Sequence, residues 1–100
     1  MRAMLIAKFV GDVAELKRTY DIGHAAIMEP GGAVQFGELR HHCAVSDDAL
    51  YIIGVWESAD QIRKRWADEQ FRANLEAVGF PSEPTEMTVL DLHQVEPPLD

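Results

Sequence analysis

Residues 50–56 read Leu-Tyr-Ile-Ile-Gly-Val-Trp, a stretch in which both alternating faces of a strand are apolar. A strand with one face in water normally alternates between apolar and polar side chains. A short turn at residues 46–48 separates the strand at residues 49–56 from a second strand-like segment at residues 34–45. Such a short connection predicts that the two segments form an antiparallel hairpin.

On either side of this hairpin the sequence predicts a strand and two helix starts. Residues 2–10 form a short segment rich in apolar residues, which is typical of a strand. Asp12 with Glu15, and Ser58 with Gln61, both have the spacing of a capping box. In that motif the first side chain accepts a hydrogen bond from a free backbone N–H of the first helical turn. We therefore expect one helix to begin at each pair.

The ends of these helices are also marked. Pro-Gly-Gly at residues 30–32 is expected to end the first helix, and Gly23 to make its middle irregular. The second helix is expected to run toward Val78, before a C-terminal cap at Gly79. Its apolar positions leave one gap of five residues, which predicts a break at residues 68–70.

A last strand at residues 85–95 completes the order βαββαβ over one domain, residues 1–100. That order is typical of the α+β ferredoxin-like fold, a four-stranded antiparallel sheet with two helices on one face. Two helices can cover one face of the sheet, whereas residues 50–56 are apolar on both. The second face is therefore expected to pack against another copy of the chain, as a symmetric homodimer.

Composition excludes several classes of protein. The 100 residues carry 9 basic and 17 acidic side chains, a formal net charge of -8. This balance argues against binding to nucleic acid or to an anionic membrane, because both need a surplus of Lys and Arg. The single cysteine, Cys43, excludes a disulfide within the chain. The apolar N-terminal stretch is too short for a signal peptide or a membrane span, so we expect a soluble cytoplasmic protein.

The stretch YIIGVWESADQIRKRW at residues 51–66 carries a family resemblance, supported by Tyr20-Asp21, Val78-Gly79-Phe80-Pro81 and Leu90-Asp91-Leu92-His93. With these residues the chain resembles the dimeric α/β-barrel superfamily that includes the antibiotic biosynthesis monooxygenases. The resemblance implies two sheets facing each other across a dimer, with a small-molecule pocket between sheet and helices in each copy. Some members of the superfamily oxidise polyaromatic quinols without metal or flavin.

Polar residues of two strands provide the first candidate site. His41 and His42 are adjacent in a strand, so their side chains must point to opposite faces. Leu90 and Leu92 are expected to face the helices, which places Asp91 and His93 on the other face. There they could meet other polar residues of the same face, namely Glu38, Arg40 and His42.

Three interpretations of this cluster stay open. It could be a salt-bridged dimer interface. It could instead be a ligand site, in which a histidine removes the proton of a phenol and a carboxylate fixes its tautomer. A third interpretation makes His42, His93 and a carboxylate a facial triad for iron, although no spacing in the sequence selects it.

The helices provide the second candidate site. Tyr20 and His24 lie one helical turn apart and so share a face, where they could line a pocket between helix and sheet. Trp66 projects from the other helix, either as a substrate contact or as plain core. Met residues could line the same pocket or fill the core equally well.

These observations predict a small-molecule-binding protein, with oxidation of an aromatic or phenolic compound without a cofactor as its activity. The alternative is a non-catalytic ligand-binding or stress-response protein of the same fold. We expect a small apolar or aromatic ligand, no metal and no cofactor. The candidate catalytic residues are His24, His42 and His93, and the candidate substrate-binding residues are Tyr20, Arg40, Trp66 and Asp91.

Overall fold

The computed structural model describes residues 1–27 and 36–99. Its elements follow the order β1 (Ala3–Val10), α1 (Val13–Ile27), β2 (Glu38–Val45), β3 (Ala49–Trp56), α2 (Ala59–Ala67), α3 (Glu69–Ala77) and β4 (Glu86–Asp91). The predicted order is confirmed, with the second helix divided in two. The expected helix end at residues 30–32 lies outside the described residues.

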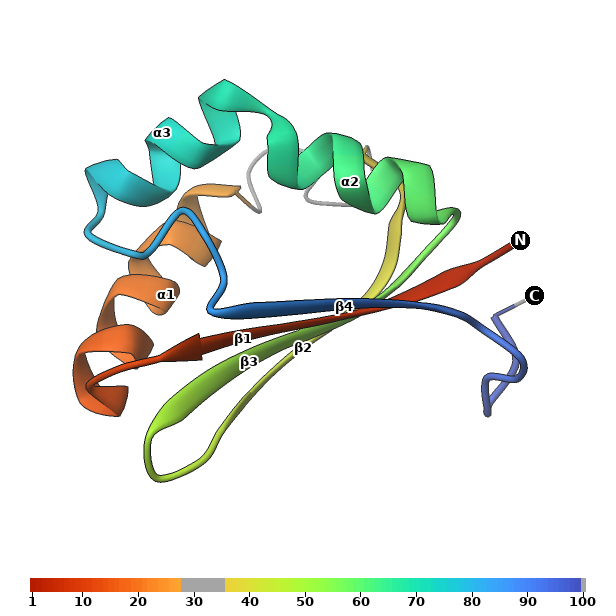
Figure 1. Ribbon diagram of the computed structural model, residues 1–100, viewed down its shortest axis with the longest axis horizontal. Helices are drawn as coiled ribbons and strands as arrows, with labels where there is room; N and C mark the ends of the chain where they lie inside the picture. The colour runs from red at the N-terminus through yellow and green to blue at the C-terminus, as the bar shows by residue number, and fades with distance from the viewer. Residues whose placement is uncertain (28–35, 100) are drawn as a thin grey trace.

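The strands form one four-stranded sheet in the order β2-β3-β1-β4, and each neighbouring pair is antiparallel. The three helices lie on the same side of this sheet, and among residues 1–27 and 36–99 no helix lies on its other side (Figure 1). The hairpin of β2 and β3 is confirmed. The fold is therefore the α+β ferredoxin-like arrangement that the sequence predicts.

The core lies between the sheet and the helices. Alternate residues of the two central strands point into it, so that Leu5 pairs with Gly54, Ala7 with Ile52 and Phe9 with Leu50. The helices add Ile62, Trp66, Phe71 and Leu75 to the same cluster. Burial of apolar surface of this kind is the main force that holds a small domain together.

The helix boundaries follow the capping residues. Ser58 is the N-cap of α2, and its side chain accepts a hydrogen bond from the backbone N–H of Gln61. Asp68 ends α2 and also caps α3, where its Oδ1 accepts from the N–H of Phe71 at 3.0 Å. The predicted break is confirmed. Gly79 follows α3 with a φ of +87°, a conformation that suits glycine.

Two sequence predictions about these elements were wrong. Helix α1 is continuous through Gly23, and a Cβ at Gly23 would approach Val78 to 3.3 Å, so the glycine allows close packing there. In β4, Val89 rather than Leu90 packs against the core, and Leu90 is 48% exposed. The register sets this, because β1 pairs Leu5 with Val89 and thereby turns Val89 toward the helices.

The side of the sheet without helices, which we call the open face, carries Tyr51 and Ile53 of β3, both half-buried. Strand β3 is thus apolar on both faces, as its sequence indicates. The segment after β4 reaches across one end of this face, because Arg40 of the opposite edge strand donates from Nη2 to the carbonyl of Pro97 at 2.9 Å.

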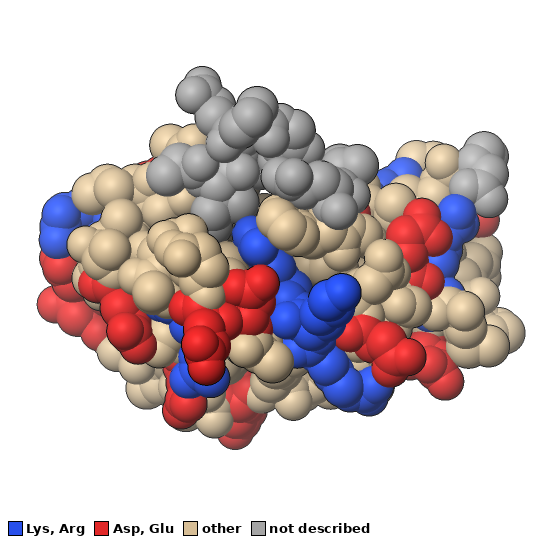
Figure 2. All heavy atoms as spheres, turned by 90° about the horizontal axis from the view of Figure 1, so that it is seen from above, with Lys and Arg blue, Asp and Glu red and all other residues tan. Residues whose placement is uncertain are grey.

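The helix side of the surface mixes charges of both signs. Lys and Arg side chains gather near the middle of this side, and Asp and Glu side chains flank them (Figure 2). Arg63 pairs with Asp60 at 3.5 Å, and both side chains are exposed. Exposed pairs of this kind contribute little to stability. Among the described residues, no helix is long and apolar enough to cross a membrane.

Candidate functional site

A cavity lies between the helix-facing side of the sheet and the three helices. Its volume is about 60 Å³, counted over the positions that the centre of a water molecule can occupy. Each bound water needs about 10–15 Å³ by this measure, so there is room for several waters or one small ring. The walls are mostly apolar and aromatic, with a few polar groups: Leu5, Thr19, Tyr20, Gly23, His24, Glu38, His41, Ile52, Trp56, Arg65, Trp66, Phe71, Leu75 and Phe80. Such a lining is typical of small-molecule sites.

Two local features of the sheet bring polar side chains into this cavity. The pairing of β2 with β3 shifts between Glu38 and Arg40, which places an extra residue in the strand at that point. Because of this irregularity, Glu38 lies on the same face as His41 instead of with Arg40. His41 pairs with Gly54 of β3, and the missing side chain there leaves room for the Glu38 carboxylate.

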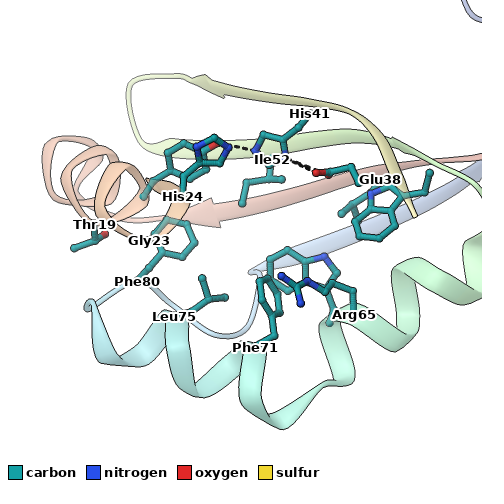
Figure 3. A pocket seen from close by; sticks show the side chains of 14 residues that line it. Thr19, Gly23, His24, Glu38, His41, Ile52, Arg65, Phe71, Leu75 and Phe80 are labelled. Carbon is teal, nitrogen blue, oxygen red and sulfur yellow. Dashed lines mark hydrogen bonds and ion pairs between the residues drawn. The ribbon is translucent and has the colours of Figure 1, made fainter. Parts of the chain in front are cut away.

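Tyr20, His41 and Glu38 form a continuous chain of hydrogen bonds along the cavity wall (Figure 3). The Tyr20 hydroxyl lies 2.5 Å from His41 Nε2. His41 Nδ1 lies 3.0 Å from each oxygen of Glu38. Because a carboxylate can only accept, His41 Nδ1 carries the hydrogen that points to it, and Nε2 accepts from the Tyr20 hydroxyl. The partners thereby fix the tautomer of His41.

His24 completes this group from α1. Its ring stacks on Tyr20 with 5.3 Å between centroids and on His41 with 5.1 Å. Burial, and then the neighbouring His41, hold the pKa of His24 below its ordinary value, so its ring favours the neutral form. Burial raises the pKa of Tyr20, with smaller contributions from Cys43 and Glu38. Tyr20 therefore keeps its proton, and donates it in the hydrogen bond to His41.

One buried donor at the cavity has no acceptor among the described residues, and a cation lies at the same wall. Trp56 is 3% exposed, and its indole Nε1 has no hydrogen-bond partner within that part of the chain. An unpaired buried N–H is costly, so such a group normally needs an explanation. Arg65 lies with its guanidinium 3.8 Å from the ring centroid of Phe36 and 3.9 Å from that of Phe71. Stacking between two rings holds the charged group in place at the cavity wall.

The structure brings together three of the residues that the sequence singled out and separates the others. Tyr20, His24 and Trp66 all line the cavity. Arg40 and His42 lie on the open face, opposite Val55 and Ile53. The placement of Asp91 on the open face was wrong, because Asp91 pairs with Ala3 and shares the side of Val89. The residues outside the cavity are Arg40, His42, Asp91 and His93.

Sequence reasoning missed four polar or donor residues that the site uses, namely His41, Glu38, Arg65 and Trp56. A signal existed for His41, since one of two adjacent strand histidines had to face the helices. No comparable signal existed for Glu38, because strict alternation puts it on the face of Arg40. His93 follows the end of β4 and is exposed. The predicted cluster of Glu38, Arg40, His42, Asp91 and His93 on one face is therefore not formed.

The described residues contain no group of three or more His, Cys, Asp and Glu side chains that could hold a metal ion. His41 and Glu38 form a hydrogen bond with each other, and His42 points to the opposite face of the sheet. Cys43, the single cysteine, is exposed beside them. Burial raises the pKa of its thiol, which disfavours the reactive thiolate.

Comparison with solved structures finds the same fold in several small proteins. SnoaB, a cofactor-independent oxygenase from Streptomyces nogalater, matches with a TM-score of 0.64 and 20% identity, over 97% of this chain and 98% of its own. A Mycobacterium tuberculosis protein matches with a TM-score of 0.65 and 15% identity, over 96% and 99%. An antibiotic biosynthesis monooxygenase matches with a TM-score of 0.56 and 14% identity, over 95% and 99%. No protein-family model and no curated protein sequence matches the chain.

The chain thus shares its fold with SnoaB and with this antibiotic biosynthesis monooxygenase. The resemblance noted in the sequence is confirmed at the level of the fold. At these identities the match carries no residue roles from one protein to another.

Proposed function

We propose that this protein binds a small aromatic or phenolic compound in the cavity between sheet and helices and oxidises it with molecular oxygen, without a cofactor. The observation that carries the proposal is the cavity wall itself. Its aromatic side chains suit a flat apolar ligand, and the hydrogen-bonded chain of Tyr20, His41 and Glu38 supplies a group that can accept a proton.

Removal of a proton is the step that such a site would supply. A phenolate gives up an electron to oxygen far more easily than the phenol does. For a ring CH₂ group conjugated with the phenolate, oxidation to a carbonyl consumes one O₂. One oxygen atom enters the product and the other leaves as water, and the substrate provides all four electrons. The protein has only to bind the substrate, take up its proton and return it.

The comparisons support this choice among the activities that the fold can host. SnoaB is described as a cofactor-independent oxygenase, and it has the same fold over nearly the full length of both chains. A shared fold alone is compatible with many reactions. The proposal therefore depends on the cavity, and the comparison only makes oxygen the co-reactant to test first.

We further propose that the protein is a homodimer that packs through the open face. Tyr51 and Ile53 of β3 remain half-buried on that face, and Leu90 of β4, on the same face, is 48% exposed. Contiguous apolar surface of this kind is typical of an interface. Sedimentation at micromolar concentration should give twice the chain mass of 11.2 kDa. A mass equal to one chain would contradict the dimer.

The function is tested by binding first and turnover second. A panel of phenols of one to three rings is screened for an increase in melting temperature, and each binder is then tested for oxygen uptake. Binding together with oxygen uptake supports the proposal. Binding without uptake would favour a non-catalytic ligand-binding protein. No binding by any phenol, while aliphatic compounds do bind, would contradict the aromatic ligand.

The variant His24→Gln belongs in the same assay, with His42→Gln as its control. His24 stacks on the hydrogen-bonded chain inside the cavity, whereas His42 is exposed on the open face. Both changes replace a histidine by a residue of similar size and polarity. If the cavity is the site, His24→Gln lowers phenol affinity and His42→Gln does not. Equal effects of the two changes would place the site elsewhere.

A further inference from the structure

The hydrogen-bonded chain, the unpaired N–H of Trp56 and the cation of Arg65 specify the ligand more closely. We propose that the ligand is an aromatic compound with an acidic hydroxyl conjugated to a second oxygen, that the hydroxyl proton passes through Tyr20 to His41, and that Trp56 and Arg65 hold the second oxygen. This inference rests on the proposed binding of an aromatic compound in the cavity. It adds the base, the direction of proton transfer and the chemical class of the ligand.

The direction of transfer follows from the tautomer of His41. Its Nδ1–H points to Glu38, and its Nε2 accepts from the Tyr20 hydroxyl. The Tyr20 oxygen still has a lone pair for a hydrogen bond from a ligand. When the ligand O–H bond breaks, its electrons stay on the ligand oxygen and its proton goes to Tyr20. Tyr20 at the same time gives its own proton to His41, which becomes an imidazolium.

Glu38 is a positioning residue in this scheme. It is 5% exposed, and both of its oxygens lie 3.0 Å from His41 Nδ1. A buried carboxylate in this position orients the ring and stabilises the imidazolium that forms, as the buried acid does in serine hydrolases. It does not reach the ligand hydroxyl, because His41 and Tyr20 lie between them.

The other titratable or charged groups near His41 do not replace it as the base. They are Glu38 and Cys43 on β2, Tyr20, Asp21 and His24 on α1, and Arg65 on α2. Among the described residues, Glu38 alone hydrogen-bonds His41 Nδ1. His24 contacts the rings of Tyr20 and His41 by stacking, and burial disfavours its charged form. A base that must become positive is better placed at His41, beside a carboxylate.

The second oxygen is inferred from the unpaired N–H of Trp56 and the positive charge of Arg65. Trp56 Nε1 is buried at the cavity without an acceptor in the described part of the chain, and the Arg65 guanidinium is stacked at the same wall. Figure 3 shows Arg65 on the far side of the cavity from His24. A ligand that spans the cavity can thus lose its proton at one end while its negative charge moves to an oxygen at the other. An N–H and a cation stabilise that charge.

The test uses para-nitrophenol, which has one ring, one acidic hydroxyl and a conjugated acceptor group, and whose anion absorbs visible light. The absorbance of the bound compound is followed as a function of pH. We expect the bound phenol to ionise about one unit or more below the free compound, since a nearby cation shifts an acid by that much. Below the pKa of the free phenol, the anion should form without release of a proton to the buffer, because His41 keeps it.

Four variants separate the parts of the scheme. Tyr20→Phe and His41→Gln should abolish the retention of the proton, and Trp56→Phe and Arg65→Gln should reduce the shift of ionisation. His42→Gln, on the open face, serves as the matched control and should leave both unchanged. Circular dichroism checks that each variant is folded, and Tyr20→Phe, which keeps the ring, is the least disruptive of them.

Three results would overturn the inference. They are failure of para-nitrophenol to bind, ionisation at the same pH as the free compound, and release of one proton for each anion bound. None of these readouts involves oxygen. A protein that consumes oxygen with other phenols but fails this test would retain the proposed function and lose the relay. A protein that ionises para-nitrophenol but never consumes oxygen would do the reverse.

Discussion

A single added methyl group at Gly54 should disturb the centre of the site. A Cβ at this position would lie 2.7 Å from Glu38 Oε2, 2.9 Å from Trp56 Nε1 and 3.2 Å from the backbone oxygen of Arg40. Contacts under 3.0 Å force a neighbour to move. The carbonyl of Arg40 is held in the sheet and the Trp56 ring is buried, so the Glu38 carboxylate must turn away. Gly54→Ala therefore weakens the Glu38–His41 pair without changing any charge.

The effect of Gly54→Ala on the free energy of unfolding can be estimated from three contributions. Loss of a charge-assisted hydrogen bond is worth about 1.5–3 kcal/mol, and overpacking of a buried site costs about 1–3 kcal/mol. Replacement of glycine in a strand stabilises the fold by roughly 0.5–1 kcal/mol, because alanine loses less conformational entropy on folding. The parts are not independent, so we expect a net loss of about 2–4 kcal/mol in the free energy of unfolding.

Urea unfolding at one fixed protein concentration measures this loss, because the stability of the proposed dimer would depend on concentration. Gly11→Ala is the matched control. Its Cβ would meet Leu16 Cδ1 at 3.5 Å, an ordinary contact, so its effect should stay within about 0.5 kcal/mol. Equal stability of the two variants would refute the close approach of Glu38 and Trp56 above Gly54.

Three further changes test the fold and the site. Ser58→Ala removes the N-cap of α2 and should cost about 1 kcal/mol. Trp56→Ala, at a site 3% exposed, should cost roughly 3–5 kcal/mol, and urea unfolding that ranks Trp56→Ala no worse than Ser58→Ala would contradict this order. His24→Gln should gain stability relative to the parent as pH falls below about 6.5, the ordinary pKa of histidine.

The sign of the pH effect follows from burial. The pKa of His24 lies below its ordinary value in the folded protein, so between the two values the unfolded chain binds more protons. The contribution of neutral His24 is complete above the unfolded pKa and is lost as pH falls toward the folded one. Unfolding measured from pH 8 to pH 5 should therefore bring the variant and the parent closer together or reverse their order. A constant difference would show that His24 titrates as it does in the unfolded chain.

Local signals in the sequence predict most of the fold. The short turn before Ala49 defines the hairpin, and Ser58 and Gly79 mark helix ends that the structure confirms. The break near Asp68 also follows from sequence, because the spacing of apolar residues leaves the helical period there. Each of these features depends on residues close together in the chain, which is why patterns can find them.

The site was harder to predict because it depends on register. Alternation assigns Glu38 to the face of Arg40, and a single irregularity in the pairing of β2 moves it beside His41. At β4, the run Met-Thr-Val-Leu-Asp of residues 87–91 offers apolar residues on both faces. Pairing with β1 decides between them and turns Val89 inward. A shift of one residue reverses every side chain, so alternation alone could not place Asp91.

Ligand binding in the cavity can be observed directly through the two tryptophans that line it, Trp56 and Trp66. In a ¹H–¹⁵N spectrum each indole N–H gives its own signal, and Trp56→Phe assigns them. Titration with a phenol that the protein binds should shift the Trp56 signal strongly and to saturation, because its Nε1 gains an acceptor that the described residues do not provide. Saturable binding that leaves the Trp56 signal in place, with shifts confined to the open face around His42 and Ile53, would contradict the assignment of the cavity as the functional site.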